Sequence, residues 1–153
     1  MFTHNVCGLN RSLLYDYVNN LSHEAHWDCL LLQELSSETV QGPLSQDSPF
    51  DSDSQGVDAH LNTLQTIKGG HLLVRGSSPW RCCGIVLNKK HAASVVAHSS
   101  GDFPSVSLCT PAGKISCISA HLPNSTHGSV EYFNACSDLF EVCSKLNLVF
   151  KLI

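Results

Sequence analysis

The chain has 153 residues, a formal net charge of −4, 42% hydrophobic residues and 14% charged residues. This balance excludes an extended disordered chain, and the length suits one domain with its own core. A dedicated nucleic-acid binder held by charge is disfavoured, because the sequence contains no basic tail and no run of Lys or Arg. No apolar run approaches the length of a transmembrane helix, so we expect no membrane contact.

The first 35 residues predict a strand, a helix and a second strand. Residues 2–6 have a pattern typical of a short strand, which a glycine then ends. From about residue 11, apolar side chains recur at helical spacing and predict a helix with one buried face, capped by Asn10 or Ser12. The apolar run over 28–34, DCLLLQE, is typical of a strand that is covered on both faces.

The rest of the chain predicts a long loop, several strands and one more helix. Residues 36–60 are rich in Ser, Asp, Gly and Pro, which favours a long surface loop. Helical spacing returns over 129–146, and a further strand pattern begins at 147. Between them, short apolar stretches predict strands at 71–75, 84–88, 93–98, 105–110 and 114–121, with a hairpin turn at 111–114. The predicted fold class is mixed α/β (α+β), in a single domain over 1–153.

The eight cysteines favour a reducing compartment. Most of them lie among apolar residues, no CxxC pair occurs, and the opening MFTHNVCGLN lacks the basic and apolar regions of a signal peptide. We therefore expect small buried thiols in an intracellular protein of the nucleus or cytoplasm, and neither disulfides nor a zinc ribbon.

Three polar residues stand at the ends of three predicted strands. Asn5 ends the first strand, Glu34 ends the second, and His121 ends the strand ISCISAH. Ligands of open α/β sheets bind at the edge where such strands end, so these residues are expected to converge there.

Metal-assisted hydrolysis of a phosphate ester would use this set. The Glu34 carboxylate suits a hard cation such as Mg²⁺ or Mn²⁺, which neutralises charge on the phosphate. The Asn5 carboxamide would orient the phosphate or a water, and the His121 ring would act as an acid or base near neutral pH.

At these residues the sequence resembles the endonuclease/exonuclease/phosphatase superfamily, whose fold is that of DNase I. The stretches HNVCGLN, LLLQE, CCGIVLN and ISAHLPN occur in the order of that family. Their spacing is most similar to the endonuclease domains of non-LTR retrotransposons, and the resemblance covers residues 2–146. It implies a four-layer α/β sandwich built on mixed sheets, here with the helices expected on one face of a single sheet.

The resemblance also implies the roles of the site residues. The family's N-x-x-G asparagine corresponds to Asn5, its metal-binding LQE glutamate to Glu34, and the active-site group of its strand ending in His or Tyr to His121. The expected sites are therefore Asn5 and His121 as catalytic residues and Glu34 as the metal ligand.

Two motifs of the family's second half do not occur in the sequence. Neither the G-D-x-N stretch nor the closing D-H pair is present, and SGDFPS at 100–105 precedes the His121 strand and lacks the Asn. The chain therefore resembles the first half of such a domain, with the C-terminal half missing. One sheet alone would expose an apolar face, so a partner chain covering that face is expected.

The leading hypothesis is thus Mg²⁺-dependent phosphodiester hydrolysis, in the manner of a DNA endonuclease, by the complete parent domain. The chain over 1–153 is expected to be weak or inactive, and DNA or another phosphodiester is the expected substrate. Two alternatives stay open: a non-catalytic interaction module that keeps the fold, and a hydrolase of the same superfamily that acts on a small phosphate ester.

Each site residue also has a purely structural explanation. Glu34 could cap a helix or pair with Arg75 or Arg81. Asn5 could form an Asx-turn, a common role for Asn after a strand. His121 alone is typical of a hydrogen-bonded histidine at a sheet edge.

Overall fold

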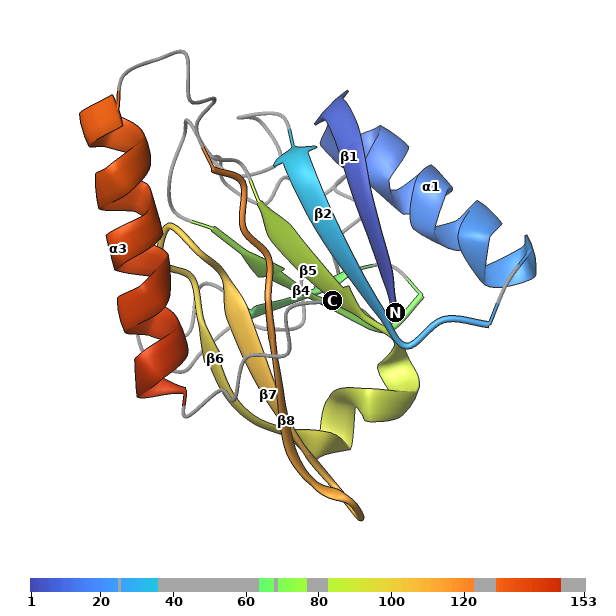
Figure 1. Cartoon of the computed structure of the whole chain (residues 1–153). Helices are drawn as coiled ribbons and strands as arrows, with labels where there is room; N and C mark the ends of the chain where they lie inside the picture. Colours follow the sequence, from blue (N-terminus) through green and yellow to red (C-terminus); the bar gives the residue numbers. More distant parts are fainter. Residues whose placement is uncertain (25, 36–63, 68, 77–82, 123–128, 147–153) are drawn as a thin grey trace.

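The computed structural model describes residues 1–24, 26–35, 64–67, 69–76, 83–122 and 129–146. These residues form a mixed α/β fold with a five-stranded sheet, a three-stranded sheet and helices outside them (Figure 1). The loop predicted over 36–60 and the strand predicted from 147 both lie outside the described residues. No helix in the described ranges combines the length and the apolar character needed to cross a membrane.

The five-stranded sheet is mixed, because one of its pairs is parallel and three are antiparallel. Across the sheet its strands are β1 (Phe2–Leu9), β2 (Cys29–Leu35), β5 (Gly84–Leu87), β4 (His71–Arg75) and β3 (Leu64–Ile67). The parallel pair is β1 and β2, and helix α1 (Arg11–Glu24) makes the crossover that a parallel pair requires. The predicted strand, helix and strand are therefore confirmed.

Helix α1 begins where Asn10 can cap it. The Asn10 side-chain oxygen accepts a hydrogen bond from the backbone N–H of Leu13 at 3.0 Å, which satisfies one of the free donors of the first turn. Leu14 and Val18 on the inner face of α1 are buried against Leu30 and Leu32 of β2. Burial of each such leucine contributes about 1.5–3 kcal/mol, which is what holds the helix on the sheet.

The smaller sheet is an antiparallel meander. Its strands are β6 (Val95–Ser99), β7 (Ser105–Thr110) and β8 (Gly113–Ile118), and the 3₁₀ helix η1 (Lys89–Ser94) leads into it from β5. The turn between β7 and β8 uses Gly113, whose φ of 116° is open to glycine and strained for other residues. This confirms the hairpin predicted around 111–114. Helix α3 (Ser129–Lys145) follows, as predicted.

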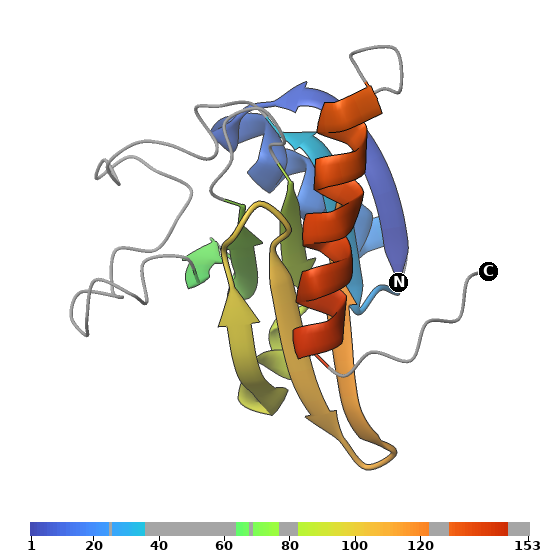
Figure 2. The same cartoon turned by 60° about the vertical axis from the view of Figure 1, so that its left-hand side comes forward.

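The two sheets pack against each other and make a second core. Ile85 and Val74 of the large sheet lie in one buried cluster with Val106 and Leu108 of β7. Figures 1 and 2 show the resulting order of layers: α1, the five-stranded sheet, the three-stranded sheet and α3. The helices therefore lie on opposite outer sides and not on one face. The apolar face that was expected to be exposed on a single sheet is covered by β6–β8.

Three further details differ from the sequence-based expectation. Strand β3 and helix η1 were not predicted, because both are short and lie beside polar segments. Strand β1 continues past Gly8 to Leu9, because an irregularity in the pairing between Asn5 and Leu9 accommodates the glycine. Strand β8 ends at Ile118, so His121 lies three residues beyond the strand and not at its end.

Replacement of Gly84 by alanine should destabilise the fold. A Cβ on Gly84 would lie 2.7 Å from Cδ1 of Leu35, a buried side chain that would have to shift within the core. We expect a loss of about 1–2 kcal/mol in the free energy of unfolding, as for overpacked cores, measured by urea denaturation. The control is Gly101→Ala, where the nearest atom would be Ser99 Oγ at 3.9 Å. Equal stability of the two variants would contradict the packing argument.

Candidate functional site

Asn5, Glu34 and His121 converge at one edge of the five-stranded sheet. The Asn5 side-chain Nδ2 donates a hydrogen bond to Glu34 Oε1 at 2.8 Å. His121 Nε2 lies 3.9 Å from the same carboxylate oxygen. All three therefore lie within the roughly 10 Å that a shared cation and phosphate would require. The structure brings together every site residue that the sequence singled out.

The parallel pairing of β1 and β2 explains the contact between Asn5 and Glu34. Asn5 is paired with Gln33 in the register of the two strands, so the residues at their carboxyl ends meet at the same edge. Glu34 follows Gln33 directly, and an irregularity in the ladder begins at this point. An irregularity of this kind changes the direction in which side chains point. Here it occurs where the Glu34 side chain points toward Asn5.

Residues 119–121 are held against β2 by two hydrogen bonds. Ser119 is buried, and its hydroxyl donates to the carbonyl of Leu32 at 3.0 Å. The Gln33 side chain donates from Nε2 to the carbonyl of Ala120, also at 3.0 Å. These bonds join a segment that leaves the small sheet to β2 of the large sheet, and they place His121 beside Glu34.

The backbone is strained at two residues of this site. The backbone angle φ is 57° at Glu34 and 45° at Cys7. Among the described residues these are the only positive φ angles outside glycine. Such conformations are unfavourable for L-residues and persist where the surrounding structure enforces them, often at functional sites. One strained residue, Glu34, is part of the contact with Asn5, and the other, Cys7, bonds to the Asn5 side chain, so the strain is concentrated at this edge of the sheet.

Asn5 also forms the Asx-turn that its position suggested. Its side-chain oxygen Oδ1 accepts a hydrogen bond from the backbone N–H of Cys7 at 3.1 Å, and the Cys7 thiol lies 3.5 Å from the same atom. The turn and the contact with Glu34 use different ends of the carboxamide. The structural explanation of Asn5 therefore holds together with the functional one, because the turn fixes the amide that faces Glu34.

The site is open to solvent. The Glu34 side chain is 42% exposed and that of His121 is 32% exposed. Water screens charges at such exposure, so the contact between them contributes little to stability. Of the two cationic partners considered for Glu34, Arg81 lies outside the described residues. The side-chain contacts of Glu34 with described residues are those with Asn5 and His121.

As a cation site, this edge offers few ligands. The contacts of Glu34 with Asn5 and His121 both use Oε1, which leaves Oε2 without a partner within the part of the chain that the structure describes. That same part contains no group of three or more His, Cys, Asp or Glu side chains placed to hold a metal. One carboxylate oxygen suits a cation that keeps most of its water, as Mg²⁺ does, and does not suit a fully enclosed ion.

Sequence reasoning missed the residues that position the site. Gln33 and Ser119 were not singled out, although both are polar residues inside otherwise apolar stretches, LLLQE and CISAH. A polar residue at a buried position of a strand requires a hydrogen-bond partner, and that requirement was the available signal.

Comparison of the chain with models of known protein families gives no match, and comparisons with curated proteins and with solved structures give none either.

The strain at Glu34 predicts an unusual response to glycine. Glu34→Gly should be more stable than Glu34→Ala by about 1 kcal/mol in urea unfolding, because only glycine accepts the positive φ without penalty. The control is the neighbouring Gln33, which has no positive φ. There the order should reverse, with Gln33→Gly less stable than Gln33→Ala. The same order at both positions would show that the backbone of Glu34 is unstrained in solution.

Proposed function

We propose that the edge formed by Asn5, Glu34 and His121 is a divalent-cation-dependent site for phosphodiester hydrolysis of the DNase I-like type. The complete parent domain would cleave DNA, in the manner of an endonuclease. The convergence of the three side chains on one carboxylate oxygen is the observation that carries the proposal. The strained backbone at Cys7 and Glu34 supports it, because strain of this kind accumulates at functional sites.

The three residues would divide the work. Glu34 would bind Mg²⁺ or Mn²⁺ through its carboxylate, and the bound cation would supply charge neutralisation at the phosphate. The Asn5 amide, fixed by its Asx-turn, would orient a phosphate oxygen or a water. The His121 imidazole would donate or accept a proton at the scissile bond, a role that suits a histidine near neutral pH.

The chain over 1–153 should be weak or inactive as a nuclease. Its sequence lacks the G-D-x-N and D-H motifs of the family it resembles, and its net charge of −4 opposes contact with a polyanion. The same net charge favours a second candidate, hydrolysis of a small phosphate ester, because a small substrate needs no extended basic surface.

A third candidate function, that of an interaction module without catalysis, is favoured by the exposed apolar side chains of α3. Val130, Phe133 and Phe140 of α3 are 65–73% exposed, although α3 buries its opposite side through Ala135 and Cys143. Exposed apolar side chains that share a helix face are typical of contact surfaces. This candidate predicts no metal binding and no effect of Glu34 substitution on any partner contact.

Cation binding is the direct test of the proposed site. Mn²⁺ added to the isotopically labelled protein should broaden amide resonances around Asn5, Glu34 and His121, because the ion is paramagnetic and would bind there. Glu34→Gln should abolish this broadening, since it removes the one carboxylate that the described residues place in the site. Asp28→Asn is the matched control, because Asp28 lies at the other end of β2 beside Lys90 and His91. Broadening centred on Asp28, or unchanged by Glu34→Gln, would refute the metal role.

Activity assays then separate the candidate functions. Nicking of supercoiled plasmid by the chain with Mg²⁺ should be weak or absent. Strong nicking that Glu34→Ala abolishes would contradict the expected low activity, although it would support the site itself. Turnover of a small aryl phosphate without plasmid nicking would favour the small-ester candidate.

A further inference from the structure

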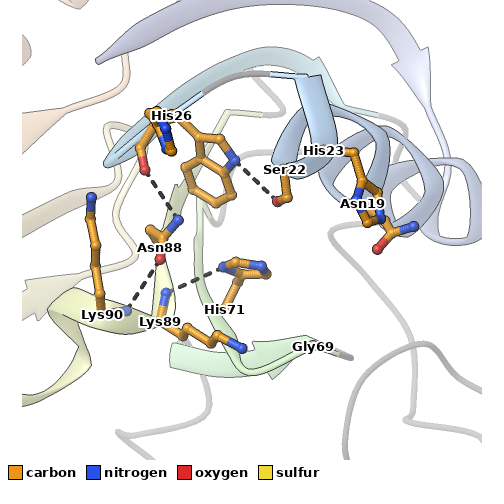
Figure 3. Close-up of a pocket in the computed structure, with 10 residues that line it drawn as sticks. Asn19, Ser22, His23, His26, Gly69, His71, Asn88, Lys89 and Lys90 are labelled. Carbon is orange, nitrogen blue, oxygen red and sulfur yellow. Dashed lines mark hydrogen bonds between the residues drawn. The ribbon is translucent and has the colours of Figure 1, made fainter.

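A second polar pocket lies at the opposite end of β2 from Asn5 and Glu34. It has a volume of about 370 Å³ and opens between the C-terminal part of α1, the start of β4 and the start of η1 (Figure 3). None of its ten lining residues is acidic. They are Asn19, Ser22, His23, His26, Trp27, Gly69, His71, Asn88, Lys89 and Lys90.

Several of these polar groups have structural partners. The Trp27 indole N–H donates to Ser22 Oγ at 3.1 Å, and Asn88 Nδ2 donates to the Trp27 carbonyl, also at 3.1 Å. The Lys90 ammonium lies 2.7 Å from Asp28 Oδ1, which neutralises its charge. These contacts help to build the wall of the pocket, and the ion pair with Asp28 offsets the charge of Lys90.

His71 is different, because one of its ring nitrogens forms no hydrogen bond with any other residue that the structure describes. Its Nδ1 accepts a hydrogen bond from the backbone N–H of Lys89 at 3.2 Å, which places the proton of the neutral ring on Nε2. His71 is only 9% exposed and its ring packs 4.9 Å from that of Trp27. No hydrogen bond joins Nε2 to another described residue, and Nε2 is not a fully buried atom without a partner, so its N–H is accessible from the pocket.

The backbone at Gly69 keeps the approach to this nitrogen open. Gly69 has a φ of 102°, and a Cβ there would stand 3.8 Å from His71 Nε2. Any other residue would be strained at this φ and would narrow the space beside the free donor. The two-glycine turn between β3 and β4 therefore preserves room for a ligand.

Lys89 supplies the charge. Its ammonium forms no ion pair with any residue that the structure describes, in contrast to that of Lys90. In Figure 3 the Lys89 side chain runs below His71 toward Gly69, while Asn19 and His23 of α1 face the same space from the other side. A cation, a buried N–H donor and an amide thus surround one cavity.

We propose that this pocket binds a small phosphorylated molecule through its phosphate group. Phosphate oxygens accept several hydrogen bonds at once and gain most from a charged donor such as the Lys89 ammonium. The volume exceeds that of a phosphate alone and suits a small phosphomonoester. Six residues, 28–33, separate Trp27 from Glu34, and an extended chain of this length spans about 20 Å, so this site is distinct from the proposed catalytic edge.

The protonation state of His71 agrees with a donor role. Burial lowers the pKa of His71, and the neighbouring Lys89 ammonium lowers it further, so the ring is neutral near pH 7 and keeps its single proton on Nε2. A bound phosphate would reverse part of this effect, because a nearby anion favours the protonated ring. Ligand binding should therefore raise the pKa of His71.

The test is a titration with glycerol 2-phosphate in the presence of a chelator, followed by calorimetry and by the imidazole nitrogen resonances of His71. The expected results are a shift of the Nε2 resonance, a rise in the His71 pKa, and a dissociation constant about tenfold weaker in Lys89→Gln. Lys90→Gln is the matched control and should bind normally, because Asp28 already neutralises Lys90. Glycerol should not bind.

The proposal is tested by more than one variant, so it does not depend on the folding of any single one. His71→Phe keeps a ring against Trp27 and removes the donor, so it should also weaken binding. If that variant fails to fold, Lys89→Gln and the His71 resonance still decide. Binding that survives Lys89→Gln, falls equally in both lysine variants, or leaves the His71 resonance unmoved would overturn the proposal. Glu34→Gln should change none of these results, so failure here and failure of the proposed hydrolase site are distinguishable.

Discussion

The parallel pairing of β1 with β2 is the constraint on which the rest of the structure depends. It requires the crossover helix α1, whose buried face then covers one side of the large sheet. It also brings the carboxyl ends of both strands to one edge, where Asn5 meets Glu34. At its other end β2 leads back to Trp27, which forms part of the wall of the second pocket. One strand therefore sets the position of both polar sites.

At the candidate active site, a strained backbone is held in place by buried leucines and by hydrogen bonds. Positive φ values at Cys7 and Glu34 each cost about 1 kcal/mol or more, and this energy must be offset by the surrounding structure. Burial of Leu32 and Leu35 on either side of Glu34 offers that compensation, since each buried leucine contributes about 1.5–3 kcal/mol. The Gln33 and Ser119 hydrogen bonds then fix the segment that carries His121.

The packing of the two sheets buries the apolar face of the large sheet that was expected to be exposed. The face of the large sheet away from α1 meets β7 within the chain, so Ile85 and Val106 belong to one core. Four of the nine large apolar side chains that are exposed among the described residues lie on α3, which forms the outer layer on the side away from α1 (Figure 2). An apolar contact with another molecule would therefore use α3 more readily than the large sheet.

The sequence by itself indicated most of the local elements and the polar residues near strand ends that were proposed as site residues. Helical spacing in α1 and α3, the apolar run of β2 and the glycine turn before β8 are short-range signals, because they depend on side-chain period and backbone freedom. The position of polar residues next to apolar strands likewise indicated Asn5, Glu34 and His121.

Only the tertiary structure decided which faces the sheets cover. It also decided that His121 reaches Glu34 from beyond the end of β8 and that Gln33 and Ser119 hold this segment in place. The second pocket also emerged only in three dimensions, because His71, Lys89 and Asn19 belong to three separate elements. Contacts between residues so distant in the sequence depend on how complete layers pack, and no local pattern encodes them.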